Sequence, residues 1–503
     1  MRKKVWVPLG IGLLLLLLLP ATSLADANDL KAAIDGKLKD SVGINSTWVI
    51  VAGCLVMFMQ AGFAFLEIGF SRGKNAGTVV AKILTNFSIA ALMWWAVGFA
   101  IAFSGPKWLG FFGHTGFFLS DYGDPLKSFP VMGTSDATIE AKFFFQFVFC
   151  AVSLAIVWGT TLERIKFGVY IIYACVFSAL IYPMAAGAVF GGGFLQEGHW
   201  LGTSIAGMQD FAGSTAVHLI GATGALAALL LLGPRKGKYG PDGKPRAIPG
   251  HSMPLFGLGV LILWLGWFGF NPGSTLGALG NRFAEIALVT NLAAAAGVLA
   301  ALTVMYQRTK TYDVGMAGNG AIAGLVAITA PSGYVEFWAA PIIGLVAGVI
   351  VVLAVLAIEK KLDDPVGALS AHGLAGIWGT LSCGLFTSTR LAEYNGIGDP
   401  GLFYSGSFSQ LGVQIVGVVA AFVMVFVLSY ATFAAIKATM GLRVSAEHEE
   451  AGLDISEHGM YGYPEQFIPQ PEYSAGPFEP SVAGTPLATS HRRAAMPEPS
   501  ATV

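Results

Sequence analysis

Charged side chains are scarce in this chain of 503 residues. Asp, Glu, Lys and Arg together make up only 12% of it, whereas soluble domains contain about 25%. This scarcity argues against an ordinary soluble domain, which needs a charged surface. Hydrophobic residues (54%) and 65 glycines take the place of charge, and small residues let membrane helices approach closely. The composition therefore predicts an all-α integral membrane protein.

An excess of basic residues and a cysteine framework are also missing. The formal net charge of -1 leaves no basic surface for nucleic acid, so we expect no nucleic-acid partner. The four cysteines, at positions 54, 150, 175 and 383, all lie in apolar stretches. We interpret them as small buried hydrophobic residues rather than disulfide partners or metal ligands. The sequence contains no evident nucleophile–base pair, metal cluster or phosphate-cradling loop, so we expect neither an enzyme nor a bound cofactor.

The N-terminal residues follow the pattern of a secretory signal. Basic residues at positions 2–4 precede a leucine-rich run at 9–19, and small residues follow up to position 25. This is the order of the three regions of a signal peptide. We therefore expect residues 1–25 to be a cleaved signal peptide and residues 26–45 to be a short outer segment. An uncleaved first helix is the alternative.

Eleven apolar stretches within residues 46–440 are long enough to cross the roughly 30 Å of hydrocarbon in a bilayer. They begin near Trp48, Gly77, Phe143, Phe167, Ser214, Met253, Phe283, Met316, Phe337, Ala368 and Leu411. Lys and Arg cluster in alternate loops, at residues 72–74, 164–166, 235–246, 308–310 and 360–361. Because cytoplasmic loops carry the excess of basic residues, we predict the N-terminus outside and the C-terminus inside.

The eleven predicted spans contain two sets of five. Consecutive sets with an odd number of spans must have opposite orientation, so we predict an inverted five-plus-five repeat. Of eight histidines, only His218 in the fifth span and His372 in the tenth lie at membrane depth. Two neutral imidazoles at the repeat interface could meet in a pore and offer hydrogen bonds without a fixed charge. Alternatively, each histidine is a hydrogen-bonded packing residue.

Aromatic residues form a second group of candidates. Phe145 and Phe149 lie four residues apart in the third span, and therefore on one helical face. The sixth span ends in a run of rings and glycines that includes Phe270 and then Ser274. Aromatic faces attract cations, and rings across a narrow path exclude water. An interfacial aromatic belt, or simple packing, is the alternative for both stretches.

Three carboxylates lie in or beside the predicted spans. Asp210 precedes the fifth span, where it is either a helix N-cap or a buried carboxylate that shapes an outer cation site. The two interpretations are compatible, because a capping carboxylate also sets the local field. For Glu67 in the first span and Glu285 near the start of the seventh, we expect structural or interfacial roles.

The C-terminal part of the chain changes in composition twice. Residues 441–462 are polar and acidic, and we expect a cytoplasmic regulatory segment there. Residues 463–503 are rich in Pro, Ala and Ser, so they lack the hydrophobic residues needed for a core and are expected to be disordered.

From about residue 45 to residue 461, the chain resembles the ammonium transporter/Rhesus family, and especially its bacterial branch. The motifs that carry this resemblance, in order along the chain, are Gly69-Phe-Ser-Arg-Gly-Lys-Asn75, Leu162-Glu-Arg-Ile-Lys-Phe167, Asp210-Phe-Ala-Gly-Ser-Thr-Ala-Val-His218, Gly266-Trp-Phe-Gly-Phe-Asn-Pro-Gly-Ser274, Asp363-Asp-Pro365, Ala371-His-Gly373, Gly441-Leu-Arg-Val444 and Gly452-Leu-Asp-Ile-Ser-Glu-His-Gly459. Any one motif would be weak evidence, but together and in order they are specific.

The resemblance implies a homotrimer in a bacterial inner membrane, with one conduction path for ammonium through each protomer. By motif position, Phe145 and Ser274 would line an outer ammonium site with Asp210 behind it, Phe149 and Phe270 would be stacked gate rings, and His218 and His372 would be the paired pore histidines. The expected activity is ammonium transport by deprotonation at the outer site and conduction through an apolar pore. An ammonium sensor or scaffold that signals through its cytoplasmic tail is the alternative.

One residue departs from the family pattern, and one partner is implied. The family often has Trp before the Gly-Gly-Gly that ends the fourth span, but this chain has Phe190. A phenyl ring binds cations less well than an indole, so we expect a weaker outer site. The resemblance also implies that a nitrogen-regulatory PII protein binds the cytoplasmic face, where residues 441–462 would lie.

Overall fold

The computed structural model describes residues 40–467, except for residues 106, 109, 121–124, 198, 201–202, 205–206 and 281. The predicted signal peptide and most of the predicted outer segment therefore lie outside the described residues. The same is true of residues 468–503 in the predicted disordered tail. The first residues of that predicted tail are described, and they include a short helix, α22 (Pro464–Phe467).

Long helices build the described part of the chain, and several contain short π-helical turns. The first half consists of α3 (Asp40–Phe70), α4 (Ala76–Met93) continued by η2 (Trp94–Gly98) and α5 (Phe99–Phe103), α7 (Ile139–Thr160), α8 (Phe167–Val176) continued by η5 (Phe177–Ile181) and α9 (Tyr182–Phe190), and η6 (Ser214–Leu219) continued by α11 (Ile220–Leu232). The second half consists of α12 (Met253–Phe270), α13 (Arg282–Thr309), α14 (Val314–Thr329), α15 (Ala339–Ile358), η9 (Leu369–Leu374) continued by α16 (Ala375–Phe386), and α19 (Ser409–Met440).

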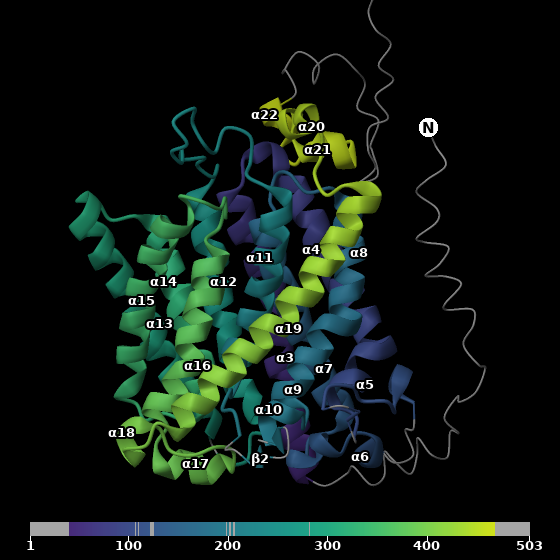
Figure 1. The fold of residues 1–503 in the computed structure, drawn as a ribbon, viewed down its shortest axis with the longest axis vertical. Helices are drawn as coiled ribbons and strands as arrows, with labels where there is room; N and C mark the ends of the chain where they lie inside the picture. The colour runs from purple at the N-terminus through teal and green to yellow at the C-terminus, as the bar shows by residue number, and fades with distance from the viewer. Residues whose placement is uncertain are drawn as a thin grey trace, which may run out of the picture.

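Short elements cover the two ends of the helix bundle. One end carries α20 (Ala446–Ala451), α21 (Leu453–His458) and α22, and we call it the tail face (top of Figure 1). The opposite face carries η3 (Phe117–Leu119), α6 (Pro125–Ser128), η4 (Pro130–Thr134), α10 (Phe194–Glu197), η7 (Pro272–Thr275), η8 (Pro331–Gly333), α17 (Thr389–Asn395) and α18 (Leu402–Ser405). Two antiparallel two-residue strands, β1 (His199–Trp200) and β2 (Thr203–Ser204), and the short helix η1 (Gly73–Asn75) complete the described elements.

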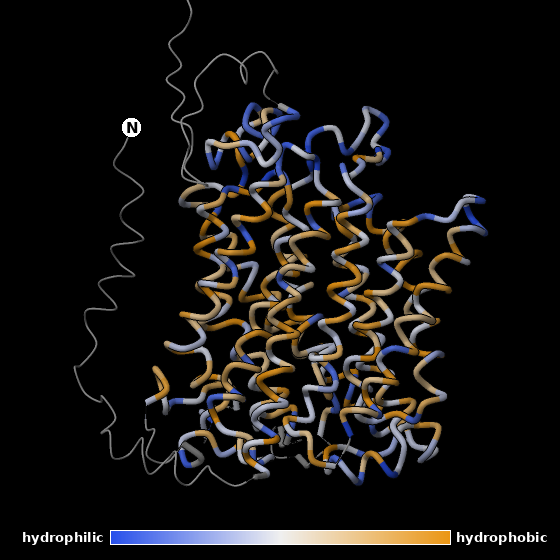
Figure 2. Tube along the Cα trace, turned by 180° about the vertical axis from the view of Figure 1, so that it is seen from behind, coloured by the Kyte–Doolittle hydropathy of each residue, from blue (hydrophilic) through white to orange (hydrophobic). Residues whose placement is uncertain are grey.

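The long helices have the hydropathy of membrane spans. Within the described residues, nine helical segments are long and apolar enough to cross a membrane, and α14 is a shorter apolar helix. In Figure 2 the middle of the bundle is hydrophobic, while hydrophilic segments gather toward its two ends. The predicted all-α membrane fold is therefore confirmed.

Glycines let the first helices of the two halves pack closely. A Cβ added at Gly259 of α12 would lie 2.3 Å from the backbone nitrogen of Leu66 on α3, and one added at Gly69 of α3 would lie 2.4 Å from the backbone nitrogen of Phe256. Backbones at this distance leave no room for a side chain. The glycine richness of the sequence thus serves helix contact, as expected for a membrane bundle.

The C-terminal segment is bound to the tail face. Asp454 of α21 accepts hydrogen bonds from the backbone nitrogens of Gly77 (2.9 Å) and Thr78 (2.7 Å), in the first turn of α4. Glu457 accepts one from the backbone nitrogen of Phe167, the first residue of α8 (3.1 Å). The free backbone N–H groups of a helix start require such acceptors. Residues after α19 therefore cap two helices of the bundle.

Candidate functional site

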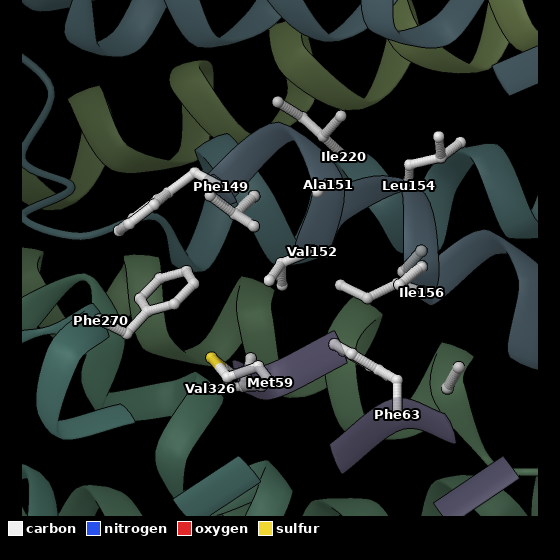
Figure 3. Close-up of a cluster of buried hydrophobic side chains, with 14 of the residues drawn as sticks. Met59, Phe63, Phe149, Ala151, Val152, Leu154, Ile156, Ile220, Phe270 and Val326 are labelled. Atoms are coloured by element: carbon white, nitrogen blue, oxygen red, sulfur yellow. The ribbon is translucent and has the colours of Figure 1, made fainter. Parts of the chain in front are cut away.

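Three predicted rings near the opposite face contact one another in a line, which we call the stack. Phe145 and Phe149 lie one turn apart on α7, with ring centres 4.6 Å apart. Phe149 stacks on Phe270, the last residue of α12, at 4.1 Å and 27°. All three side chains are almost completely buried. Figure 3 shows Phe149 and Phe270 side by side at one end of a cluster of hydrophobic side chains.

The two predicted pore histidines meet beneath this stack. The Nδ1 atoms of His218 and His372 lie 3.2 Å apart, although 154 positions separate the two residues. The His218 ring stacks at 5.4 Å on Phe270 and at 5.2 Å on Trp267. Both histidines are buried, and the Nε2 atom of His218 has no hydrogen-bond partner among the described residues. The pair therefore joins the ring stack in one line of aromatic groups.

A π-helical turn positions each histidine. His218 belongs to η6 and His372 to η9, at equivalent places in the two halves of the chain. In a π-turn, some backbone carbonyls lose the N–H donor that they would have in an α-helix. Other groups must then donate hydrogen bonds to these carbonyls. The Ser153 hydroxyl donates to the carbonyl of Val217 (2.8 Å), and thus stabilises the turn beside His218.

An aspartate precedes each of these turns by the same spacing. Asp210 lies eight residues before His218, and its two carboxylate oxygens accept hydrogen bonds at 2.9–3.0 Å from four successive backbone nitrogens, those of residues 213–216. Asp364 lies eight residues before His372 and accepts from the backbone nitrogens of Gly367 (3.0 Å) and Leu369 (2.8 Å). The helix-capping role predicted for Asp210 is thus present, and it recurs in the second half.

Ser274 and Phe190 lie outside the stack itself. The Ser274 hydroxyl donates to the carbonyl of Phe270 (2.9 Å), and a Cβ added at the neighbouring Gly273 would lie 2.7 Å from the Phe145 ring. Phe190 ends α9 and is half-buried. Among the described residues, no ring contact joins Phe190 to Phe145 or Phe149, so its place at an outer site stays a prediction.

A small cavity of about 20 Å³ lies on the other side of the histidines, toward the tail face. Its apolar lining comes from five helices or turns and includes Phe63, Ile156, Leu263, Ile322 and Ala371. The polar groups on its wall belong to Glu67, Asn319 and His372. In Figure 3, Phe63 and Ile156 lie at the end of the hydrophobic cluster away from Phe149 and Phe270.

This cavity adjoins a second, larger one at the tail face. The second cavity has a volume of about 240 Å³ and shares Asn319 and Val366 with the first. Its other lining residues include Arg235 and Lys238 from the loop between α11 and α12. The rings, the histidine pair and the two cavities therefore follow one another from the opposite face to the tail face.

The two glutamates that we expected to be structural differ from each other. Glu285 is ion-paired with Arg282 and with Arg390 (2.6 Å), which agrees with a structural role. Glu67 lines the cavity beneath the histidines, and neither of its carboxylate oxygens has a hydrogen-bond partner among the described residues. A purely structural interpretation of Glu67 does not account for this position.

Sequence reasoning missed several residues of this path. Trp267 stacks on His218 and donates from Nε1 to the hydroxyl of Thr329 (2.9 Å), and only its place among alternating rings and glycines hinted at this role. Asp364 was recognisable by its spacing from His372, which repeats that of Asp210 from His218. Phe63 and Asn319 carried no sequence signal, because nothing in their own segments shows that they face a cavity.

A buried ion-pair network ties the loops of the tail face together. Asp363 accepts from Arg235 Nε and Nη2, both at 2.9 Å, and lies near Arg164. Burial alone would raise the pKa of Asp363, but the Arg235 hydrogen bonds and the two guanidinium charges outweigh it and lower that pKa to about 2. Within the described residues, no group of three or more His, Cys, Asp or Glu side chains is arranged to hold a metal ion.

Comparison with known proteins identifies the family of this chain. Ammonium transporter Amt2 of Archaeoglobus fulgidus is 44% identical over 461 residues, which cover 90% of this chain and 95% of that protein. A solved structure named Sensor Amt Protein matches with a TM-score of 0.74 at 37% identity, covering 83% of this chain and 99% of that one. Mep2 of Candida albicans matches with a TM-score of 0.73 at 28% identity, covering 82% and 88%.

The resemblance seen in the motifs is therefore confirmed over almost the whole described region. Residues 47–463 match the model of the Ammonium Transporter Family. Its members are transporters and not enzymes, which agrees with the expectation from the sequence. This chain belongs to the ammonium transporter family.

Proposed function

We propose that this membrane protein moves ammonium across a bacterial inner membrane by taking up the cation at an outer site, removing its proton and conducting ammonia past His218 and His372. The observation that carries this proposal is the unbroken order of stacked rings, buried histidine pair and apolar cavity. A path of this kind suits a small neutral molecule that forms hydrogen bonds.

Electrostatics explain why the proton is removed. Moving a bare ammonium ion into a medium of low dielectric constant costs tens of kcal/mol by a Born estimate. Removing a proton at pH 7 from a group with a pKa of about 9–10 costs only about 3–4 kcal/mol. Deprotonation therefore avoids the larger penalty, and the histidines supply hydrogen bonds to the neutral molecule.

The outer site would lie at the opposite face. There, Phe145, Ser274 and Phe190 would surround the cation, and Asp210 would bias the local field toward positive charge. Phe149 and Phe270 would form the gate between this site and the histidines. The stack that joins Phe145 to Phe149 and Phe149 to Phe270 supports this order of roles.

The membrane topology that fits this function has eleven crossings. The N-terminus would lie outside and the tail face in the cytoplasm. The basic residues Arg72, Arg164 and Arg235 support it, because they belong to tail-face loops and cytoplasmic loops are enriched in Lys and Arg. Three such protomers would form a homotrimer. The bound segment 441–462 and the basic loop 235–246 would then offer a surface for a PII-type regulator.

Flux through the purified protein tests the transport function. Proteoliposomes that contain only this protein should give an inward flux of ammonium or methylammonium down an imposed gradient, whereas empty liposomes should not. A wild-type protein without flux, which still assembles as a trimer, would contradict transport and favour the sensor.

The sensor alternative is less well supported. One structural neighbour carries the word sensor in its name, but the relative at 44% identity is named as a transporter. The succession of rings, histidine pair and two cavities also favours conduction, because a protein that only reported ammonium would need no exit toward the tail face.

A further inference from the structure

Glu67 is a buried carboxylate for which the transport path described above assigns no role. It lies one turn before the end of α3 and only 1% of the residue is exposed. Both of its oxygens are buried without a hydrogen-bond partner among the described residues. A buried polar group without a partner is costly, so its retention needs an explanation.

The position of Glu67 supplies that explanation. Its side chain lines the same cavity as His372, with Asn319 as the third polar residue on the wall. Because Asn319 also lines the larger tail-face cavity, Glu67 lies where the apolar path meets the exit. A Cβ added at Gly159, another lining residue, would lie 3.5 Å from Glu67 Oε1, so this glycine leaves space beside the carboxylate.

Lys82 on α4 is the nearest candidate for a counter-ion. It is also fully buried, its ammonium group lies 5.5 Å from the centre of the Tyr170 ring, and it interacts electrostatically with Glu67. However, no Lys82–Glu67 contact within 4.0 Å occurs among the described ion pairs, and Lys82 Nζ also lacks a hydrogen-bond partner there. Lys82 is thus close enough to interact with Glu67 electrostatically, but it does not occupy the carboxyl oxygens.

We propose that Glu67 forms a second cation site, on the inner side of the histidine pair, where ammonia regains a proton and is held as ammonium before release. This inference rests on the proposed function, because it assumes that ammonia arrives from the histidines. The carboxylate oxygens would accept hydrogen bonds from the ammonium N–H groups, and the Asn319 amide oxygen would serve as a neutral ligand.

The chemical step is a simple proton transfer. The O–H bond of the protonated Glu67 carboxyl group breaks and a fourth N–H bond forms on ammonia, which leaves an ammonium–carboxylate pair. When the ion departs through the tail-face cavity, Glu67 takes a proton from a hydronium ion in the water there. The sum is ammonia plus hydronium giving ammonium plus water, and Glu67 is restored.

Glu67→Gln tests the site by rate. In proteoliposomes, we expect the maximal ammonium flux to fall by at least about tenfold, in line with loss of a general acid, while the half-saturation concentration at the outer side changes less than about twofold. Asp242→Asn is the control, because Asp242 lies on an exposed tail-face loop and lines neither cavity, and it should keep wild-type flux. Wild-type flux in Glu67→Gln would overturn the proposal.

Glu67→Asp is a second test variant, for use if gel filtration shows that Glu67→Gln does not assemble. The carboxyl group remains but withdraws by one methylene, so we expect a flux between those of Glu67→Gln and the wild type. A flux equal to that of the wild type would count against a role for carboxylate position.

A binding measurement separates the two proposals. Infrared difference spectra between ammonium and sodium buffers should show a carboxyl signal in the wild type that disappears in Glu67→Gln and persists in Asp242→Asn. A wild-type spectrum without that signal rejects the inner site. If the wild type gives normal flux but no carboxyl signal, only the inner site is rejected. If the wild type gives the carboxyl signal but no flux, transport is rejected and the inner site remains.

Discussion

At the scale of single residues, the histidine pair has an unusual hydrogen-bond geometry. Its two Nδ1 atoms face each other at 3.2 Å, and a hydrogen bond between them needs a proton on one and a lone pair on the other. The partnerless Nε2 atom of His218 is left for another molecule. This hydrogen bond exists only if both rings are present.

Replacing either histidine should change what the pore conducts. We expect His218→Ala and His372→Ala to abolish or alter ammonium-driven current, because each removes one half of the hydrogen-bonded pair. Currents recorded from proteoliposomes on a solid-supported membrane would measure this, with potassium and sodium gradients as selectivity controls. Unchanged current and selectivity in both variants would show that the pair is only packing.

A substitution at Phe190 tests the predicted outer site. An indole binds cations more strongly than a phenyl ring, so Phe190→Trp should lower the half-saturation concentration for ammonium by about fivefold if about 1 kcal/mol is gained. Phe403→Trp is the control, because Phe403 lies exposed on α18 of the same face. An unchanged or higher value for Phe190→Trp would place Phe190 outside that site.

At the scale of elements, helix starts on the tail face depend on residues far along the chain. The caps of α4 and α8 come from Asp454 and Glu457, after the last long helix. The backbone also pairs there, with Lys166 N donating to the Leu442 carbonyl (3.0 Å) and Val444 N to the Arg164 carbonyl (3.0 Å). Movement of this segment would therefore alter the ends of two helices.

Removing one cap should loosen the segment. Asp454→Ala loses acceptors for Gly77, Thr78 and Gly462 nitrogens, and loss of a cap costs about 0.5–2 kcal/mol. We expect a lower melting temperature and faster protease cleavage between residues 441 and 462 than in Asp242→Ala, whose carboxylate is on an exposed tail-face loop. Equal cleavage rates would show that the cap does not hold the segment.

Truncation extends the same test. A chain that ends after Tyr463 keeps both capping residues, so its conduction and regulation should match those of the full chain. A chain that ends after Met440 loses them and should be uncoupled or inactive. Normal flux and regulation in this shorter chain would contradict a regulatory role for residues 441–462.

The Asp363–Arg235 pair should make stability depend on acid. Because the folded-state pKa of Asp363 is about 2, below the ordinary value of 3.8, its stabilisation is present above about pH 4 and is lost as the pH falls toward 2. The shift corresponds to roughly 2 kcal/mol. The melting temperature of Asp363→Asn in detergent should be lower than that of the wild type at pH 6 and should change less between pH 4 and pH 2. Parallel curves for both proteins would contradict this assignment.

At the scale of the whole molecule, the tail face offers a composite surface. The acidic segment contacts the basic loop through Glu449, which accepts from the Lys236 backbone nitrogen (2.6 Å) and pairs with Arg443 (2.6 Å). In a trimer this surface would appear three times around one axis. A trimeric partner that bound all three copies would gain from effective concentration.

A PII-type regulator should therefore be recovered with the intact protein. We expect pull-downs from nitrogen-replete cells to contain such a protein with the full chain and with the chain ending after Tyr463, but not with the chain ending after Met440. Recovery of no PII-type protein with the full chain would overturn this expectation.

The sequence by itself determined the membrane class, the places of the long helices and the family. These properties are local, because a helix in hydrocarbon must satisfy its own backbone and display apolar residues over its length. The two histidines, the rings and Asp210 could also be named from their segments. Their meeting at 3.2 Å and 4.1 Å could only be suggested, since spacing along the chain does not state which helix faces reach a shared axis.

Only the tertiary structure decided what surrounds these groups. The residues next to Glu67 in the sequence are apolar, and they do not show whether its side chain faces lipid, a lysine or a cavity. The direction of the side chain depends on how α3 packs against the other helices. The place of Asn319 on the walls of both cavities depends on packing in the same way. Side-chain contacts between helices distant in sequence arise from packing, and hydropathy, which is a property of each segment alone, does not encode them.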